Sequence, residues 1–208
     1  MKLRTILLFG APGAGKGTLG KILGTIPNFF HFACGDAFRN LTIENEIGRI
    51  FIDYSSRGQL VPEETTIRLW KQSIEGSRRV GRYNPQKDTL VLDGIPRNAT
   101  QAQIMSETLD VVAVFHLKCS NLDQLVERMQ RRALRENRLD DANMEIIQAR
   151  LETYERETKS VLDYYGTDLV HFIDSSQTPT NVLRAILDVI AALPPAQACS
   201  ADAGLLPV

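Results

Sequence analysis

The stretch "GAPGAGKGT" at residues 10–18 lies between an apolar run, "TILLF" (5–9), and a helical pattern. Its four glycines let the backbone approach an anion closely, so that N–H groups and the next helix N-terminus can cradle phosphate oxygens. We expect Lys16 to reach the β- and γ-phosphates of a nucleotide. The hydroxyl group that normally follows the lysine comes one place later, at Thr18, because Gly17 intervenes. The alternative, a plain glycine-rich turn joining a strand to a helix, is disfavoured by the lysine among these glycines.

Short apolar runs alternate with helical patterns along the rest of the chain. Each run is too short for a helix and rich in β-branched or aromatic residues, which is typical of buried parallel strands. The predicted strands are 5–9, 29–33, 89–93, 111–117 and 169–173, and the predicted helices are 16–25, 36–54, 62–76, 99–107, 121–133, 142–165 and 179–193. This order predicts an α/β fold of the P-loop type with three layers, in which helices flank a central parallel sheet of five strands.

Two segments interrupt the alternation and are predicted to be appendages of a single domain. Residues 34–80 form a helical insertion, and residues 132–142 form a short polar segment between two helices. The core then comprises residues 1–33, 81–131 and 143–193. Appendages that flank a phosphate loop are candidates for moving covers.

Two further stretches lack a helical or strand pattern. Residues 77–88 are predicted to be a polar loop, for which a simple insertion is favoured over a partner site. Residues 194–208 begin with two prolines and are predicted to be a mobile tail outside the 1–193 domain.

The composition argues against several classes of function. The chain has 24 Lys and Arg against 25 Asp and Glu, so it lacks the basic field that favours nucleic acid or an anionic membrane. Its three cysteines form no C-x-x-C pair and no zinc spacing, so we expect no structural zinc and a reducing, cytoplasmic location. The N-terminal apolar run leads straight into the glycine loop without a cleavage site, and no stretch is long enough to span a membrane. We expect a monomer.

Three other stretches carry polar side chains suited to a ligand: "FACGDAFR" (32–39), "SRGQLVPEE" (56–64) and "LVLDGIPRNATQAQ" (90–103). Asp36 is placed to cap a helix, and Arg39 follows one turn later on a similar face. Asp93 ends a strand beside the phosphate loop, where a carboxylate can hold the hydration shell of Mg²⁺. Arg97 offers a planar fork to phosphate oxygens, and Gln101 offers an amide to a nucleobase edge. Taken singly, these stretches also fit a capped helix, a loop before a proline-initiated helix and a strand-to-helix turn.

A run of arginines follows in "ERMQRRALRENRLDDANMEIIQARLETY" (127–154). The arginines are Arg128, Arg131, Arg132, Arg135, Arg138 and Arg150. Such a run is usually a solvated helix face, but crowded like charges are costly unless an anion neutralises them. Preorganised arginines can stabilise the charge that spreads over a transferring phosphoryl group.

Together these motifs resemble the nucleoside monophosphate kinases, and among them the adenylate kinases with a short lid, over residues 3–193. The resemblance implies reversible phosphoryl transfer from ATP to AMP, giving two ADP, with Mg²⁺ bound through water by Asp93. It makes 34–80 the monophosphate-binding insertion and 132–142 the lid. The implied ATP-binding residues are Gly13, Ala14, Gly15, Lys16, Gly17, Thr18, Arg128 and Gln177. The implied AMP-binding residues are Cys34, Arg39, Gln59, Leu60, Val61, Gly94, Ile95, Pro96, Arg97, Gln101, Arg138 and Arg150. The implied catalytic residues are Lys16, Arg97, Arg132, Arg138 and Arg150, while Arg131 and Arg135 have no family role.

The chain departs from the family pattern at the acceptor side, which keeps two alternatives open. Cys34 stands where the family usually has Thr or Ser, and Ile95 replaces an aromatic residue. A pyrimidine kinase of the UMP/CMP type is the nearest alternative, since Gln101 favours adenine but Cys34 and Asn98 weaken that assignment. A P-loop hydrolase or a nucleotide-controlled binding module is the other, and it would leave Arg39, Arg97 and Gln101 without a role.

Overall fold

Five parallel strands form the central sheet of the computed structural model, which describes residues 2–136, 138, 141 and 143–194. The strands are β1 (Leu3–Gly10), β2 (Phe29–Ala33), β3 (Thr89–Asp93), β4 (Leu109–Lys118) and β5 (Val170–Asp174), in the order β2-β3-β1-β4-β5. The chain builds one side of β1 with β2 and β3, then crosses to the other side for β4 and β5. Such a reversal leaves a crevice at the carboxyl ends of the strands, where the glycine loop follows β1.

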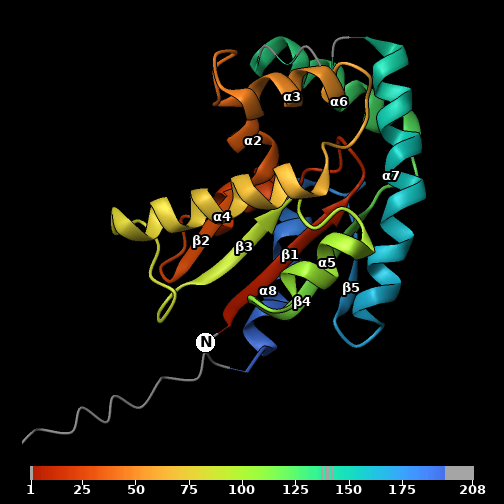
Figure 1. The fold of residues 1–208 in the computed structure, drawn as a ribbon. Helices are drawn as coiled ribbons and strands as arrows, with labels where there is room; N and C mark the ends of the chain where they lie inside the picture. Colours follow the sequence, from red (N-terminus) through yellow and green to blue (C-terminus); the bar gives the residue numbers. More distant parts are fainter. Residues whose placement is uncertain (1, 137, 139–140, 142, 195–208) are drawn as a thin grey trace, which may run out of the picture.

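Helices cover both faces of this sheet, which confirms the predicted three-layer fold (Figure 1). Alternate residues of β1 point to opposite faces: Ile6 and Leu8 join one hydrophobic cluster, while Leu7 and Phe9 join the other. The first cluster includes side chains of α1 (Lys16–Leu23), α6 (Leu122–Glu136) and α8 (Pro179–Ala192). The second includes side chains of α4 (Glu63–Arg79), α5 (Ala99–Met105) and the C-terminal part of α7 (Met144–Tyr165).

Two short helices, α2 (Cys34–Arg39) and α3 (Glu46–Ser55), stand above the sheet in Figure 1. The sequence predicted one helix over 36–54, but the chain breaks between them, and the Asn45 side chain caps α3 by accepting from the Ile47 N–H at 2.8 Å. The prediction that Asp36 caps a helix was wrong. Helix α2 already begins at Cys34 after Ala33, so Asp36 lies in its first turn.

Two predicted loops differ in extent from the structure. Helix α4 continues through Arg79, and Tyr83 is buried with its ring 5.0 Å from that of Phe30, so the stretch 77–88 is partly helical and anchored to β2. Helix α6 continues through Glu136 and therefore contains the first residues of the predicted lid. The predicted tail lies outside the described residues from 195 onward.

Packing does not separate the whole predicted insertion from the core. Trp70 and Ile74 of α4 are buried in the same cluster as the sheet residues Leu90 and Leu92. The domain boundaries at 34 and 80 therefore remain predictions, with α2 and α3 as the part that stands apart from the sheet.

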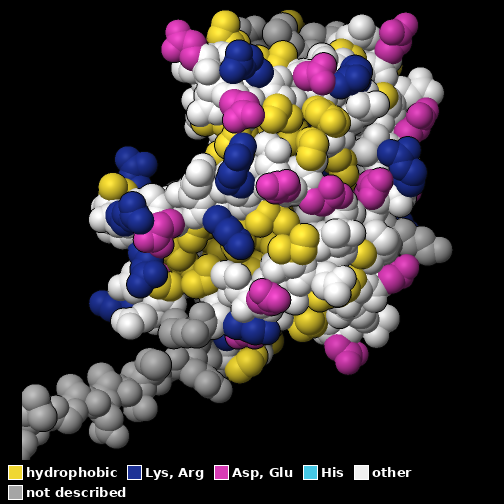
Figure 2. Space-filling model, viewed as in Figure 1, with side chains coloured by type: hydrophobic (Ala, Val, Ile, Leu, Met, Phe, Trp, Pro, Cys, Tyr) yellow, Lys and Arg dark blue, Asp and Glu magenta, His cyan; other side chains and the backbone are white. Residues whose placement is uncertain are grey.

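The exposed charges are mixed in sign. Figure 2 shows Lys and Arg side chains interspersed with Asp and Glu on the face in view, in keeping with the net charge of -1. Among the described residues, no helix combines the length and the apolar character needed to cross a membrane.

Candidate functional site

A cavity of about 560 Å³ lies at the carboxyl ends of the strands, and residues of the two predicted covers, 34–80 and 132–142, also line it. Its wall comes from the glycine loop, α2, the segment 58–61, the segment 93–97, α6, α7 and the turn after β5. Segments far apart in the sequence thus meet at one site.

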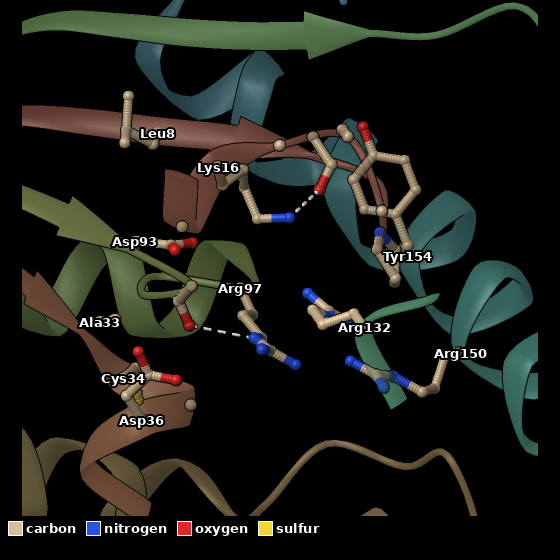
Figure 3. Close-up of a pocket in the computed structure, with 18 of the residues that line it drawn as sticks. Leu8, Lys16, Ala33, Cys34, Asp36, Asp93, Arg97, Arg132, Arg150 and Tyr154 are labelled. Atoms are coloured by element: carbon tan, nitrogen blue, oxygen red, sulfur yellow. Dashed lines mark hydrogen bonds between the residues drawn. The ribbon is translucent and has the colours of Figure 1, made fainter. Parts of the chain in front are cut away.

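The glycine loop folds around the Lys16 ammonium group (Figure 3). Lys16 Nζ donates to the carbonyl oxygens of Gly10 at 2.7 Å and Ala11 at 3.1 Å. Gly13 has φ 84°, and a Cβ there would lie 2.6 Å from the carbonyl oxygen of Leu125, so only glycine lets the loop pass so close to α6. The loop therefore holds a lysine at the cavity wall, and at Gly13 no side chain separates its backbone from α6.

Burial in this loop lowers the pKa of Lys16 to about 8, while the Asp93 carboxylate opposes the shift and nearby arginines add to it. Lys16 loses its positive charge as the pH rises through this value. Because kcat/KM reports pKa values of the free enzyme, we expect kcat/KM for the phosphate-bearing donor to fall with rising pH above about 8. Rate profiles from pH 6 to 10 test this. The residual activity of Lys16→Arg should lack this alkaline limb, because arginine stays charged, and a limb unchanged in that variant would assign it to another group.

Asp93 is suited to a metal-bound nucleotide. It ends β3, is paired in register with Leu8 of β1, and its Oδ2 lies 3.5 Å from where a Cβ on Gly17 would be. A carboxylate beside the phosphate loop fits an outer-sphere contact to hydrated Mg²⁺. Among the described residues no group of three or more His, Cys, Asp or Glu could hold a metal ion.

Most residues assigned to the acceptor line the same cavity. They are Cys34, Arg39, Gln59, Leu60, Val61, Gly94, Pro96, Arg97, Gln101, Arg138 and Arg150. Ile95 is placed differently: it is 1% exposed, belongs to the hydrophobic core and does not line the cavity. Burial raises the pKa of the Cys34 thiol to about 12, so this group faces the cavity as a neutral thiol.

The orientation of the Gln101 amide follows from its hydrogen bonds. Its Oε1 accepts from the backbone N–H of Arg97 at 2.8 Å, and its own backbone N–H donates to Asn98 Oδ1 at 2.9 Å. Since only an oxygen can accept from an N–H group, the amide nitrogen is the end available to a ligand. Asn98 in turn donates to Glu63 Oε1 at 2.8 Å, which ties this turn to α4.

A fully buried carboxylate holds two arginines of the lid side. Asp141 is 0% exposed; its Oδ2 accepts from Arg132 Nε at 2.7 Å, and its Oδ1 accepts from Arg150 Nη1. The sequence pattern contained Asp141, but it gave no role to this residue. The structure shows that Asp141 brings together two arginines 18 positions apart in the sequence.

A second carboxylate joins the predicted insertion 34–80, called the acceptor cover below, to the predicted lid 132–142, called the lid side. Asp36 Oδ1 accepts from Arg39 Nη2 at 2.8 Å and from Arg138 Nη2 at 3.1 Å. Burial would raise the pKa of Asp36, but the hydrogen bond and charge of Arg39, together with Arg138 and Lys21, lower it. The sequence assigned Asp36 to a helix cap and missed this bridge across 102 positions.

The residues assigned to the donor base lie at the other end of the cavity. Arg128 Nη1 donates to the carbonyl oxygen of Ser175 at 3.0 Å, so α6 meets the turn after β5. Gln177 lines this end with Pro179 and Val182. In the sheet, β1, which leads into the glycine loop, lies between β5 at this end and β3 and β2, which lead into the acceptor-side residues.

Among the cavity residues on α7, the sequence interpretation missed Thr153 and Tyr154. Tyr154 lies beside the glycine loop in Figure 3, and its hydroxyl group is 2.7 Å from His116 Nε2 of β4. Thr153 lines the cavity, is 8% exposed and donates to the carbonyl oxygen of Gly58 at 3.3 Å. Their only sequence signal was a spacing of three and four residues from Arg150, which places them near it on a helix.

Comparison with known proteins finds matches to nucleotide kinases. A family model described as adenylate kinase matches residues 8–170. An adenylate kinase of Corynebacterium urealyticum is 33% identical over 188 residues, covering 88% of this chain and 96% of the relative. An adenylate kinase of Bifidobacterium longum is 36% identical over 166 residues, covering 77% and 84%. A UMP-CMP kinase of Homo sapiens is 30% identical over 196 residues, covering 91% and 97%.

Proposed function

The chain belongs to the adenylate kinase family, and within that family we propose that it transfers the γ-phosphoryl group of ATP to AMP, giving two ADP. One observation carries the proposal: a single cavity joins the glycine loop to Gln101 and to the arginines Arg39 and Arg97. A loop for a donor triphosphate thus faces a second site with cations for a phosphate and an amide for a base. That arrangement suits transfer to a nucleotide acceptor.

Positioning and electrostatics are sufficient for this chemistry. The acceptor is already an anionic phosphate oxygen, so no general base is needed to activate it. Lys16 would neutralise charge on the β- and γ-phosphates, and Arg132 and Arg150 would stabilise the charge on the transferring group. Arg39 and Arg97 would hold the acceptor phosphate in line.

Mg²⁺, held with the nucleotide near Asp93, would add charge neutralisation at the phosphate oxygens. Closure of the two covers over both substrates would exclude water, which otherwise competes with the acceptor. We also propose, as the sequence predicts, that the protein is cytoplasmic and acts as a monomer.

A pyrimidine acceptor is the alternative that a specific observation favours. Cys34 presents a thiol, a weak hydrogen-bond partner, at the acceptor side of the cavity. The human relative named for UMP and CMP is about as similar as several relatives named adenylate kinase. A screen of AMP, CMP, UMP and GMP as acceptors decides between the two, and a preference for CMP or UMP would replace AMP as the substrate.

We expect Gln101→Ala to lower kcat/KM for AMP about tenfold or more, since losing one buried base contact costs about 1.4 kcal/mol. The apparent affinity for ATP should change little. Gln101→Glu separates the two functions of this side chain, because it keeps an oxygen for the Arg97 N–H but removes the amide donor. Gln103→Ala, an exposed glutamine of the same helix, is the matched control. If Gln101→Ala and Gln101→Glu keep the kcat/KM for AMP of the wild type, as the Gln103→Ala control should, base recognition by Gln101 is contradicted.

A further inference from the structure

Helix α7 contacts three different parts of the molecule within five residues. Arg150 binds Asp141, Thr153 donates to the carbonyl oxygen of Gly58, and the Tyr154 hydroxyl meets His116 of the sheet. The helix therefore touches the lid side, the acceptor cover and the core from one short stretch. The contact between Thr153 and Gly58, which joins α7 to the acceptor cover, has no part in the proposed chemistry.

That contact is a close approach of backbone to helix. Gly58 is buried and has φ 68°, and a Cβ there would lie 2.9 Å from Ala149 Cβ, 3.1 Å from the Arg150 nitrogen and 3.1 Å from the Ile146 carbonyl oxygen. All three atoms belong to α7. The chain therefore rests directly on the helix at a point where a side chain of any size would push the two apart.

The three residues after Gly58 line the cavity as the predicted acceptor-base loop: Gln59, Leu60 and Val61. The rest of the cover sets the shape of this loop. The Gln59 N–H donates to the Tyr54 carbonyl oxygen at 3.0 Å, and Thr66 Oγ1 donates to the Val61 carbonyl oxygen at 3.3 Å. The contact with α7 sets where this preformed loop lies relative to Arg150.

We infer that Thr153 and Gly58 form a seat by which α7 positions the acceptor-base loop, so that Thr153 is a positioning residue for the monophosphate. The inference rests on the proposed function and deepens it. The seat joins the acceptor cover to the helix that carries Arg150, and it forms only when the cover lies against α7. Its hydrogen bond therefore stabilises the observed position of Gln59, Leu60 and Val61 at the cavity wall.

Removing the Thr153 hydroxyl group tests the seat. Thr153→Val keeps the shape but leaves the Gly58 carbonyl oxygen without this donor, so we expect KM for AMP to rise about three- to tenfold. KM for ATP and kcat should stay within about twofold. Thr153→Ser restores the hydroxyl group and should return KM for AMP to within about twofold of the wild type. Calorimetric binding of AMP to the same variants gives a readout that does not depend on turnover.

A second pair of variants separates the effect of the close contact between Gly58 and α7 from the effect of backbone strain at a glycine with positive φ. Gly58→Ala adds a methyl group that meets α7, whereas Gly81→Ala adds one at φ 72° with no atom within 4 Å. Both should lower the melting temperature through strain at positive φ. Only Gly58→Ala should raise KM for AMP, by about tenfold or more if the methyl group forces the loop off its seat.

The outcomes distinguish this inference from the proposed function. The wild-type acceptor screen tests the function first, and the variants are then assayed with whichever monophosphate the wild type prefers. The seat is supported if Thr153→Val and Gly58→Ala raise the acceptor KM selectively and serine restores it. It is overturned if Thr153→Val leaves the acceptor KM unchanged, if it raises both KM values alike, or if Gly81→Ala matches Gly58→Ala.

Discussion

Replacing Lys16 with methionine is expected to lower kcat by about two to four powers of ten while the fold stays intact, by analogy with the loss of one transition-state charge stabiliser. Within the part of the chain that the structure describes, Lys16 Nζ donates only to the carbonyl oxygens of Gly10 and Ala11, and both belong to its own loop. Its ammonium group is therefore placed to exchange those carbonyl oxygens for phosphate oxygens. Methionine is unbranched and only one atom shorter than lysine, so it removes the charge while most of the packing in the loop is kept.

The measurement is steady-state turnover with saturating ATP and acceptor, beside a thermal melt. Lys71→Met on α4, an exposed lysine away from the cavity, controls for the general effect of removing a positive charge. A melting temperature close to the wild type with a large loss of kcat would support the assignment. Turnover within a few-fold of the wild type would remove Lys16 from the phosphate site.

The sheet could be predicted from the sequence because each of its strands is apolar over a short run. β3, "TLVLD" at 89–93, is a clear case: four of its five residues are buried, so hydrophobicity alone marks it. The phosphate loop could be predicted because its turns need glycine locally: Gly13 at φ 84° and Gly15 at φ 99° have a backbone conformation that other residues rarely adopt. Both features depend on residues that are neighbours in the sequence, so the local order of apolar residues and glycines is enough to predict them.

The bridges across the cavity could not be predicted, because they depend on contacts between distant segments. Asp36 fitted a local role as a helix cap, and nothing near it in the sequence pointed to Arg138, 102 positions away. The His116–Tyr154 pair joins a strand to a helix 38 positions later, and neither residue type is unusual in its place. The break between α2 and α3 was missed for a different reason: the capping residue Asn45 lies inside a stretch that otherwise fits one helix.

The buried carboxylate of Asp141 gives the second large expected effect. Asp141→Asn keeps the size of the side chain but removes the charge that faces Arg132 and Arg150. Losing one partner of a buried ion pair costs about 3–5 kcal/mol when the other charge stays buried. Arg132 and Arg150 keep 28% and 16% of their side-chain surface exposed, so water can offset part of that cost.

We therefore expect Asp141→Asn to lower kcat by about a hundredfold, because both arginines lose the group that aims them at the transferring phosphoryl group. The exposed Asp110→Asn on β4 is the matched control for stability and turnover. The direction of the change in KM for ATP separates two roles of this carboxylate. If Asp141 positions the arginines, KM should stay or rise while kcat falls. If it instead competes with phosphate for them, the variant would bind ATP more tightly, and a lower KM with kcat within about threefold of the wild type would contradict the positioning role.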